Sequence, residues 1–320
     1  MTSVAAFFRS GLIRLYKVCL RIFGGRGLQR IRPLGSVAYY ITNLITRLPR
    51  PERISFLGHT FFLDPYDNLG LTFWDEGELH PGELKLVEQF VRNGDVVLDI
   101  GANIGFFTLV YARAVGEKGH VFAFEPEPRN ASLLRKNIAV NGYRNITVLE
   151  RAVGEKSRAV KLFLSNYNMG DHRIYDPYER TKSWEKSSAV YDRLQHKYDR
   201  RISVDIPLVS IDGFFKGTTR RIDFVKIDVQ GAEGGVLKGM LATLRKNKSV
   251  KIVTEFWPAG LKMFGVDAEE YLSLFQNLGF SFYEVANEAD APIRPVTKEF
   301  LLKRYTVSNN LTGNLFLRRD

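Results

Sequence analysis

The sequence predicts an α/β protein: a Rossmann-like, mostly parallel sheet with helices on both faces, preceded by a basic helical arm. Three observations support this fold class. From residue 82 onward, short apolar segments alternate with amphipathic ones, as strands and helices do around a parallel sheet. A glycine pair directly follows the first long apolar run. With 320 residues and 45% hydrophobic side chains, the chain can bury one large core.

Residues 1–51 are predicted to form a basic, amphipathic helical arm. Within residues 3–23 the apolar side chains share one helical face, and Arg14, Lys17 and Arg21 share the opposite one. Nine of the eleven net positive charges fall in the first fifty residues. No uncharged apolar stretch there reaches the roughly 18 residues of a membrane span. The arm is therefore expected either to lie along an anionic membrane surface or to pack on its own domain or on a second subunit.

A β-hairpin and linker, residues 52–81, are predicted to join the arm to the main domain. Residues 53–63 have the pattern of two short strands that turn around Gly58. The main domain, residues 82–320, is predicted to begin with a helix at 82–93.

Runs of Val, Ile, Leu and Phe, separated by amphipathic stretches, define the elements of the main domain. The predicted strands are residues 96–100, 120–125, 146–152, 222–227, 250–255, 280–285 and 314–318. The predicted helices between them are residues 105–115, 128–141, 232–246 and 267–278. Right-handed crossovers bring the carboxyl ends of parallel strands to one edge, where open α/β sheets bind their ligands.

An insertion at about residues 165–203 interrupts this alternation. Its sequence is polar and rich in aromatic residues, and candidate strands flank it at 159–164 and 204–209. A loop of this length inside a compact domain is usually functional or mobile. The insertion is therefore expected to be a lid or a mobile segment.

The sequence VVLDIGANIGFFTL, which starts at residue 96, predicts a ligand-binding turn. Gly101 and Gly105 flank three residues just after a strand, and glycine lets the backbone approach a ligand closely. The helix that follows offers free N–H groups and a positive dipole end, which suit a carboxylate. Asp99 is placed either to hold this loop or to meet a cationic amine.

An acid at the end of the second strand completes the pattern. Glu125 lies 24 residues after Gly101, and an acid in this position commonly binds both hydroxyls of a ribose. In dinucleotide-binding loops a middle glycine accommodates the pyrophosphate, whereas here Asn103 takes that place. A nucleoside without phosphates fits better, so S-adenosylmethionine (SAM) is the expected cofactor.

Five motifs resemble the FkbM family of SAM-dependent methyltransferases. They are GDVVLDIGANIGFFTL, FAFEPEP, LLRKNIAVNG, RAVGEKS and IDFVKIDVQGAEGGVLKGM, and the similar region covers about residues 80–285. The resemblance implies the class I methyltransferase fold, a seven-stranded sheet with its last strand antiparallel. It also implies O-methylation of sugars, of lipid-linked or secreted glycans, or of polyketide hydroxyls.

The same resemblance implies where each part of SAM binds. The residues that would line the methionine end are Asp99, Gly101, Asn103, Gly105 and Phe106. Those that would bind the ribose and border the adenine are Glu125 with Pro126, and Arg151 with Ala152.

Methyl transfer to a hydroxyl requires an aligned acceptor and the removal of one proton. Three side chains are candidates for taking that proton: Asp228 after the fourth predicted strand, Glu255 at the end of the fifth, and His172 in the insertion. Histidine titrates near neutrality and is the usual general base. Each candidate also has a structural alternative, as a loop residue or a capping acid. Trp257 offers a flat surface for a sugar ring, and Lys226 is expected only to pack its aliphatic stem.

The favoured function is SAM-dependent O-methylation of a hydroxyl on a sugar, glycan, glycolipid or similar small molecule. The main alternative is RNA or protein methylation, with the arm binding phosphates. The chain has Asp228-Val-Gln-Gly after the fourth strand rather than the Asn/Asp-Pro-Pro-Tyr pattern that accepts an exocyclic amine, which argues against base methylation. A catalytically silent SAM-fold module that docks through its arm is the remaining alternative.

Composition indicates the cellular setting. The single cysteine, Cys19, excludes an internal disulfide and a cysteine-based metal cluster, which fits a reducing compartment. We expect a cytoplasmic protein, peripheral at the inner membrane face if its arm binds lipid. The expected partners are a small-molecule or glycan acceptor and, through the arm, an anionic membrane or a second subunit; nucleic acid is not expected. No metal is expected either, because the two carboxylates of Asp228 and Glu255 alone do not make a site.

Overall fold

The computed structural model describes residues 52–64, 80–165, 169–177, 201–286 and 293–319. The predicted arm and most of the predicted insertion lie outside these residues. In the described part of the chain, no helix is both long and apolar enough to cross a membrane.

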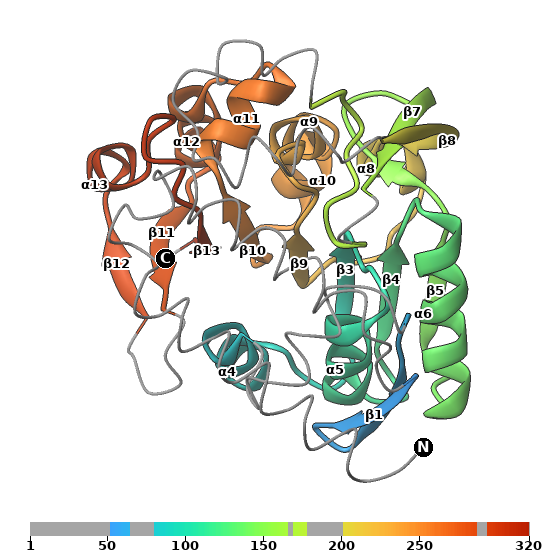
Figure 1. Ribbon diagram of the computed structural model, residues 1–320. Helices are drawn as coiled ribbons and strands as arrows, with labels where there is room; N and C mark the ends of the chain where they lie inside the picture. Colours follow the sequence, from blue (N-terminus) through green and yellow to red (C-terminus); the bar gives the residue numbers. More distant parts are fainter. Residues whose placement is uncertain (1–51, 65–79, 166–168, 178–200, 287–292, 320) are drawn as a thin grey trace, which may run out of the picture.

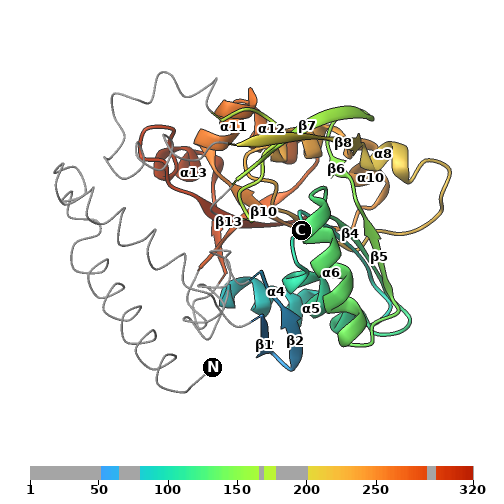
Figure 2. The ribbon, with the colours of Figure 1, turned by 45° about the vertical axis from the view of Figure 1, so that its right-hand side comes forward.

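A hairpin precedes the main domain, as the sequence predicts. Strand β1 (Arg53–Phe56) pairs antiparallel with β2 (His59–Phe62). Leu57 and Gly58 between them both have positive φ, as in the two-residue turns that match the twist of a hairpin. The hairpin lies beside the first helices of the main domain (Figure 2).

The main domain is built on an eight-stranded sheet (Figure 1). In spatial order its strands are β12 (Arg294–Val296), β11 (Ser281–Val285), β13 (Gly313–Arg318), β10 (Lys251–Phe256), β9 (Phe224–Ile227), β3 (Val96–Ile100), β4 (His120–Phe124) and β5 (Ile146–Leu149). The strands from β10 to β5 are parallel, and β13 runs antiparallel between β10 and β11. The predicted mostly parallel sheet is confirmed, with all seven predicted strands, and the short β12 adds an eighth at the edge.

Helices cover both faces of this sheet (Figure 2). The helices on the face of the hairpin are α4 (Pro81–Phe90), α5 (Phe106–Val115) and α6 (Pro128–Val140). The helices on the opposite face are α8 (Ile211–Phe214), α9 (Glu233–Lys238), α10 (Leu241–Lys246), α11 (Pro258–Phe264), α12 (Ala268–Asn277) and α13 (Lys298–Arg304). Val97 packs with α4 and α5, whereas its neighbour Leu98 packs in the cluster on the other face. Both faces of the strands are therefore apolar, which explains their continuous hydrophobic runs.

Two predicted elements differ from the structure. The helix predicted over residues 232–246 is broken between α9 and α10 at Gly239, where a Cβ would lie 2.0 Å from the Gly154 carbonyl oxygen. The strand predicted over 146–152 ends at Leu149, because the chain then leaves the main sheet.

A second sheet of three strands lies over the carboxyl ends of β4 and β5 (Figure 1). Its order is β6 (Ala152–Val153), β8 (Ile202–Val209) and β7 (Arg158–Leu164). The strands predicted on either side of the insertion are thus confirmed, and they pair antiparallel with each other. An isolated bridge between Phe163 and Arg173 places the described part of the insertion beside β7.

Candidate functional site

A cavity of about 450 Å³ opens at the carboxyl ends of β3, β4, β9 and β10. At this edge the order of the strands reverses, because the chain proceeds from β3 to β4 on one side and later returns to β9 on the other. Open α/β sheets bind ligands at such a point. The predicted site residues that line the cavity are Asp99, Gly101, Asn103, Phe106, Glu125, Pro126, Arg151, Ala152, His172, Asp228 and Glu255.

Gly105 is the predicted site residue that does not line the cavity. It caps the N-terminus of α5 with a φ of 96°. A Cβ on this residue would lie 2.4 Å from Leu134 Cδ1 of α6. Its backbone conformation and its contact with α6 require glycine, so Gly105 supports the loop from behind and does not itself border the cavity.

Gly101 brings the tips of β3 and β9 together. Its φ is +88°, and a Cβ there would lie 1.9 Å from the Asp228 carbonyl oxygen. The N–H groups of Gly101 and Ala102 both donate to the Phe124 carbonyl oxygen, each at 3.0 Å. Glycine is therefore required here for a close approach of two strand ends.

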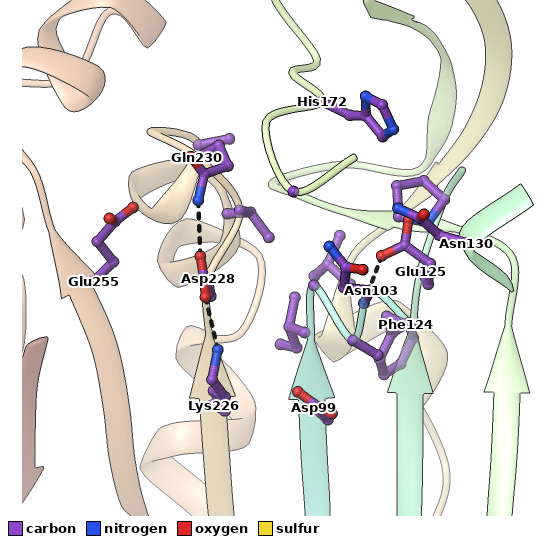
Figure 3. A pocket seen from close by; sticks show the side chains of 18 of the residues that line it. Asp99, Asn103, Phe124, Glu125, Asn130, His172, Lys226, Asp228, Gln230 and Glu255 are labelled. Carbon is purple, nitrogen blue, oxygen red and sulfur yellow. Dashed lines mark hydrogen bonds and ion pairs between the residues drawn. The ribbon is translucent and has the colours of Figure 1, made fainter. Parts of the chain in front are cut away.

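Glu125 holds the glycine loop from the neighbouring strand. Its Oε2 accepts a hydrogen bond from the Asn103 N–H at 2.8 Å (Figure 3). Its Oε1 accepts one from the Glu127 N–H at 2.9 Å. Burial raises the pKa of Glu125 to about 7, although these two hydrogen bonds oppose the rise. A carboxylate oxygen has two lone pairs, so each oxygen can still accept a ligand hydroxyl.

Two asparagines attach the insertion to the rim of the cavity. Asn130 Nδ2 donates to the Met169 carbonyl oxygen at 2.9 Å, and Asn103 Nδ2 donates to the same oxygen at 3.4 Å. Both asparagines line the cavity, as do Met169 and Gly170. The described part of the insertion therefore forms a wall of the cavity.

His172 is separated from the other two candidate bases. Figure 3 shows it on the side of the pocket with Glu125 and Asn130, whereas Asp228 and Glu255 lie on the other side, at the ends of β9 and β10. Its Nδ1 accepts a hydrogen bond from the Ser165 N–H at 3.0 Å. In the neutral imidazole the proton is then on Nε2, so that nitrogen donates. His172 is thus better suited to donate a hydrogen bond than to take up a proton.

Two side chains hold Asp228 at the carboxyl end of β9. Lys226 Nζ donates to its Oδ2 at 2.8 Å, and Gln230 Nε2 donates to its Oδ1 at 3.0 Å (Figure 3). The side chain remains 40% exposed, toward the cavity that it lines. Burial in the protein acts to raise its pKa, but the Lys226 ammonium and the two hydrogen bonds outweigh it and hold the pKa below the usual range. Asp228 is therefore a carboxylate at neutral pH.

The surroundings of Glu255 shift its pKa in the opposite direction from that of Asp228. Burial and then the neighbouring charges of Asp228 and Glu233 raise the pKa of Glu255 well above its usual value. Its Oε1 accepts a hydrogen bond from the Thr312 hydroxyl at 2.9 Å. Its Oε2 is buried, and no described residue hydrogen-bonds to it. The two acids therefore differ in the direction of their pKa shifts, which is downward for Asp228 and upward for Glu255.

Trp257 does not offer the surface for a sugar that the sequence suggested. The guanidinium of Arg173 lies 4.9 Å above its ring, and its indole N–H donates to Asn310 Oδ1 at 2.8 Å. The ring also packs closely on Gly260. Trp257 is thus engaged within the protein.

Several residues that line the cavity were not predicted as site residues from the sequence. They are Asn130, Lys226, Gln230, Thr312 and Asn314, among others. The spacing of Lys226 and Asp228 was an available signal, because residues two apart in a strand share a face. Thr312 and Asn314 reach the cavity only because β13 inserts beside β10, and no local sequence pattern predicts that pairing.

Among the residues described, no three His, Cys, Asp or Glu side chains are arranged to hold a metal ion.

Comparisons with known proteins identify relatives of this chain. The family profile described as the methyltransferase FkbM domain matches residues 99–282. The methyltransferase sdnD of Sordaria araneosa is 32% identical over 185 residues, which are 52% of this chain and 68% of that protein. The 2-O-methyltransferase NoeI of Sinorhizobium fredii is 27% identical over 173 residues, which are 52% of this chain and 65% of that protein. Methyltransferase 1 of Beauveria bassiana is 25% identical over 146 residues, which are 45% of this chain and only 57% of that protein.

Solved structures with a similar fold are more distant. A SAM-dependent O-methyltransferase of Thermotoga maritima superimposes with a TM-score of 0.37 and 15% identity, covering 87% of this chain and 81% of that one. Fibrillarin of Aeropyrum pernix, solved with natively bound SAM, gives a TM-score of 0.39 and 10% identity, covering 74% of this chain and 76% of that one. At these TM-scores the matches say nothing about substrate or mechanism.

Proposed function

The chain belongs to the FkbM methyltransferase domain family, and from this premise we propose that it uses SAM to methylate a hydroxyl of a sugar, glycan, glycolipid or similar small molecule. The observation that carries the proposal is one continuous cavity, which joins the glycine turn and Glu125 to Asp228 and Glu255. A methyl donor and its acceptor must share one site, because the transfer is a direct displacement. The name of the relative NoeI, a 2-O-methyltransferase, agrees with an oxygen acceptor.

The residues at one end of the cavity fit SAM. The Glu125 carboxylate keeps lone pairs for the two ribose hydroxyls, and the turn at Gly101 exposes backbone to the cavity. Asp99 lines the cavity and can meet the amino group of the methionine end, and Arg151 with Ala152 borders the side expected for adenine. SAM supplies a methyl group on a positively charged sulfur, whose bond to carbon is easily displaced.

The residues at the other end fit a hydroxyl acceptor. Asp228, Gln230, Glu255 and Asn314 supply carboxyl and amide groups that hydrogen-bond to hydroxyls. As the acceptor oxygen attacks, its proton must leave, and Asp228 is the ionised group there. A phosphate would be repelled by this carboxylate, so the site favours an uncharged polyhydroxyl compound over RNA.

The acceptor class is tested by incubating the protein with methyl-labelled SAM and three sets of acceptors: methyl glycosides, RNA, and a denatured protein mixture. The expected result is label in a glycoside, with a mass increase of one methyl group. Label found only in RNA or protein would contradict the hydroxyl assignment. A protein that shows no heat of binding with SAM would instead be the silent docking module.

Glu125→Ala is expected to weaken SAM binding by about 10- to 150-fold, because it removes a charge-assisted contact of roughly 1.5–3 kcal/mol. Isothermal titration calorimetry measures the effect. Glu150→Ala is the matched control, since Glu150 follows the next strand, is 44% exposed and pairs with Arg135 on the surface. Equal affinities of the two variants would rule out the ribose contact.

A further inference from the structure

Lys226 is a buried cation for which the reaction outlined above has no role. Its side chain is 6% exposed, and its ammonium group lies 2.8 Å from Asp228 Oδ2. Lysine is almost never buried to this extent unless it is paired. A lysine that served only to fill space could be replaced by an apolar residue, so its charge requires an explanation.

The surroundings of Lys226 compensate its charge. In the sheet its registered partner on β3 is Asp99, which accepts a hydrogen bond from the Thr108 hydroxyl. From α4, Glu83 also acts on it, and the ring of Phe107 lies 5.1 Å from Nζ. Burial acts to lower the pKa of Lys226, but the carboxylates of Asp228, Glu83 and Asp99 outweigh it and raise the pKa. Lys226 is therefore charged at neutral pH.

Other charged groups also face Asp228. His80 precedes α4 and lines the cavity, and its electrostatic effect lowers the pKa of Asp228. The charge of Asp228 raises the pKa of Glu255 on β10 and that of Glu233 at the start of α9. Removing Lys226, the only cation at hydrogen-bond distance from Asp228 among the described residues, would therefore raise the pKa of Asp228.

We propose that Lys226 is a positioning residue of the methyl-transfer site, which fixes the Asp228 side chain at the acceptor end of the cavity and keeps it in the carboxylate form. This inference rests on the proposed function. In the step that it serves, the acceptor oxygen forms a bond to the methyl carbon as the carbon–sulfur bond breaks and leaves its electron pair on sulfur. The hydroxyl proton passes to Asp228, and Lys226 keeps its own proton throughout.

The ionisation of Asp228 is measured directly by carbon-13 NMR of protein labelled at the aspartate carboxyl carbon. The Asp228 signal is identified by its absence in Asp228→Asn. In the wild type we expect it to stay at the carboxylate position down to a pH below that at which an ordinary aspartate titrates. In Lys226→Met, which removes the charge and keeps most of the length of the side chain, we expect the Asp228 midpoint to rise by about 1–3 pH units. Lys161→Met removes an exposed partner of Asp205 and should leave the Asp228 signal unchanged.

Two outcomes would overturn the inference: an Asp228 midpoint in the wild type at or above the usual aspartate value, or a midpoint that Lys226→Met does not move. The wild-type titration remains decisive if Lys226→Met does not fold. A role confined to packing would also leave the signal unmoved, because methionine fills a similar space.

Turnover separates this inference from the proposed function. With a glycoside that the wild type methylates, Lys226→Met should lower kcat while the KM for SAM stays near the wild-type value. A wild type that binds SAM but methylates no glycoside would contradict the proposed function, whereas the NMR result for Asp228 would stand by itself.

Discussion

Asp228→Asn is expected to lower turnover by about 10²–10⁴-fold, the usual contribution of a general base. Asparagine keeps the size of the side chain but cannot take up the proton of the acceptor. The affinity for SAM should stay near the wild-type level, because Glu125 and the glycine turn are unchanged. Steady-state rates with a glycoside that the wild type methylates measure turnover. Calorimetry with SAM measures the affinity separately.

Two further variants sharpen this prediction. Asp205→Asn changes an exposed aspartate of β8 and should leave turnover unchanged. Glu255→Gln should have a smaller effect than Asp228→Asn, since the raised pKa of Glu255 favours its protonated form, which resembles an amide. If Asp228→Asn keeps full activity and Glu255→Gln is inactive, then Glu255 rather than Asp228 is the general base.

Gly101→Ala is expected to have the largest effect on stability. An alanine there must adopt a φ of +88°, which costs about 1–2 kcal/mol. Its Cβ would also meet the Asp228 carbonyl oxygen at 1.9 Å, so β3 and β9 must move apart, at a further cost of roughly 1–3 kcal/mol. Urea unfolding measures the total change in the free energy of unfolding, and SAM binding should be lost as the turn shifts.

Gly142→Ala provides a matched control for this prediction. Gly142 also has a positive φ, +74°, but a Cβ on it would have nothing within 4 Å. Its substitution should therefore carry only the conformational cost and should leave SAM binding unchanged. If both alanine variants lose the same free energy of unfolding, the close approach of β3 and β9 is not what requires Gly101.

The sequence predicts most of the fold because the strands are buried on both faces. Their uninterrupted apolar runs, such as residues 96–100 and 224–227, stand out from the amphipathic helices between them. Elements without such a contrast were missed: α11 and α13 are short, and β12 has three residues and exists only through its pairing with β11.

The residues around the glycine turn were easier to place from the sequence than those near β9 and β10. Asp99, Gly101, Asn103 and Glu125 lie at or just after the ends of two adjacent strands, where a local motif fixes their position. Near β9 and β10, Lys226 lowers the pKa of Asp228 from the same strand, and their spacing is visible in the sequence. The pKa of Glu255 is raised first by burial and then by Asp228 and Glu233, and these causes depend on the tertiary fold.

The central claim is that a nucleoside lies across the tips of β3 and β4. A crystal structure with S-adenosylhomocysteine, the demethylated product, tests it most directly. We expect both ribose hydroxyls at about 3 Å from the Glu125 carboxylate and the amino-acid tail against the turn at Gly101. A nucleoside bound at any other place, or a Glu125 side chain that points away from the ribose, would contradict the account.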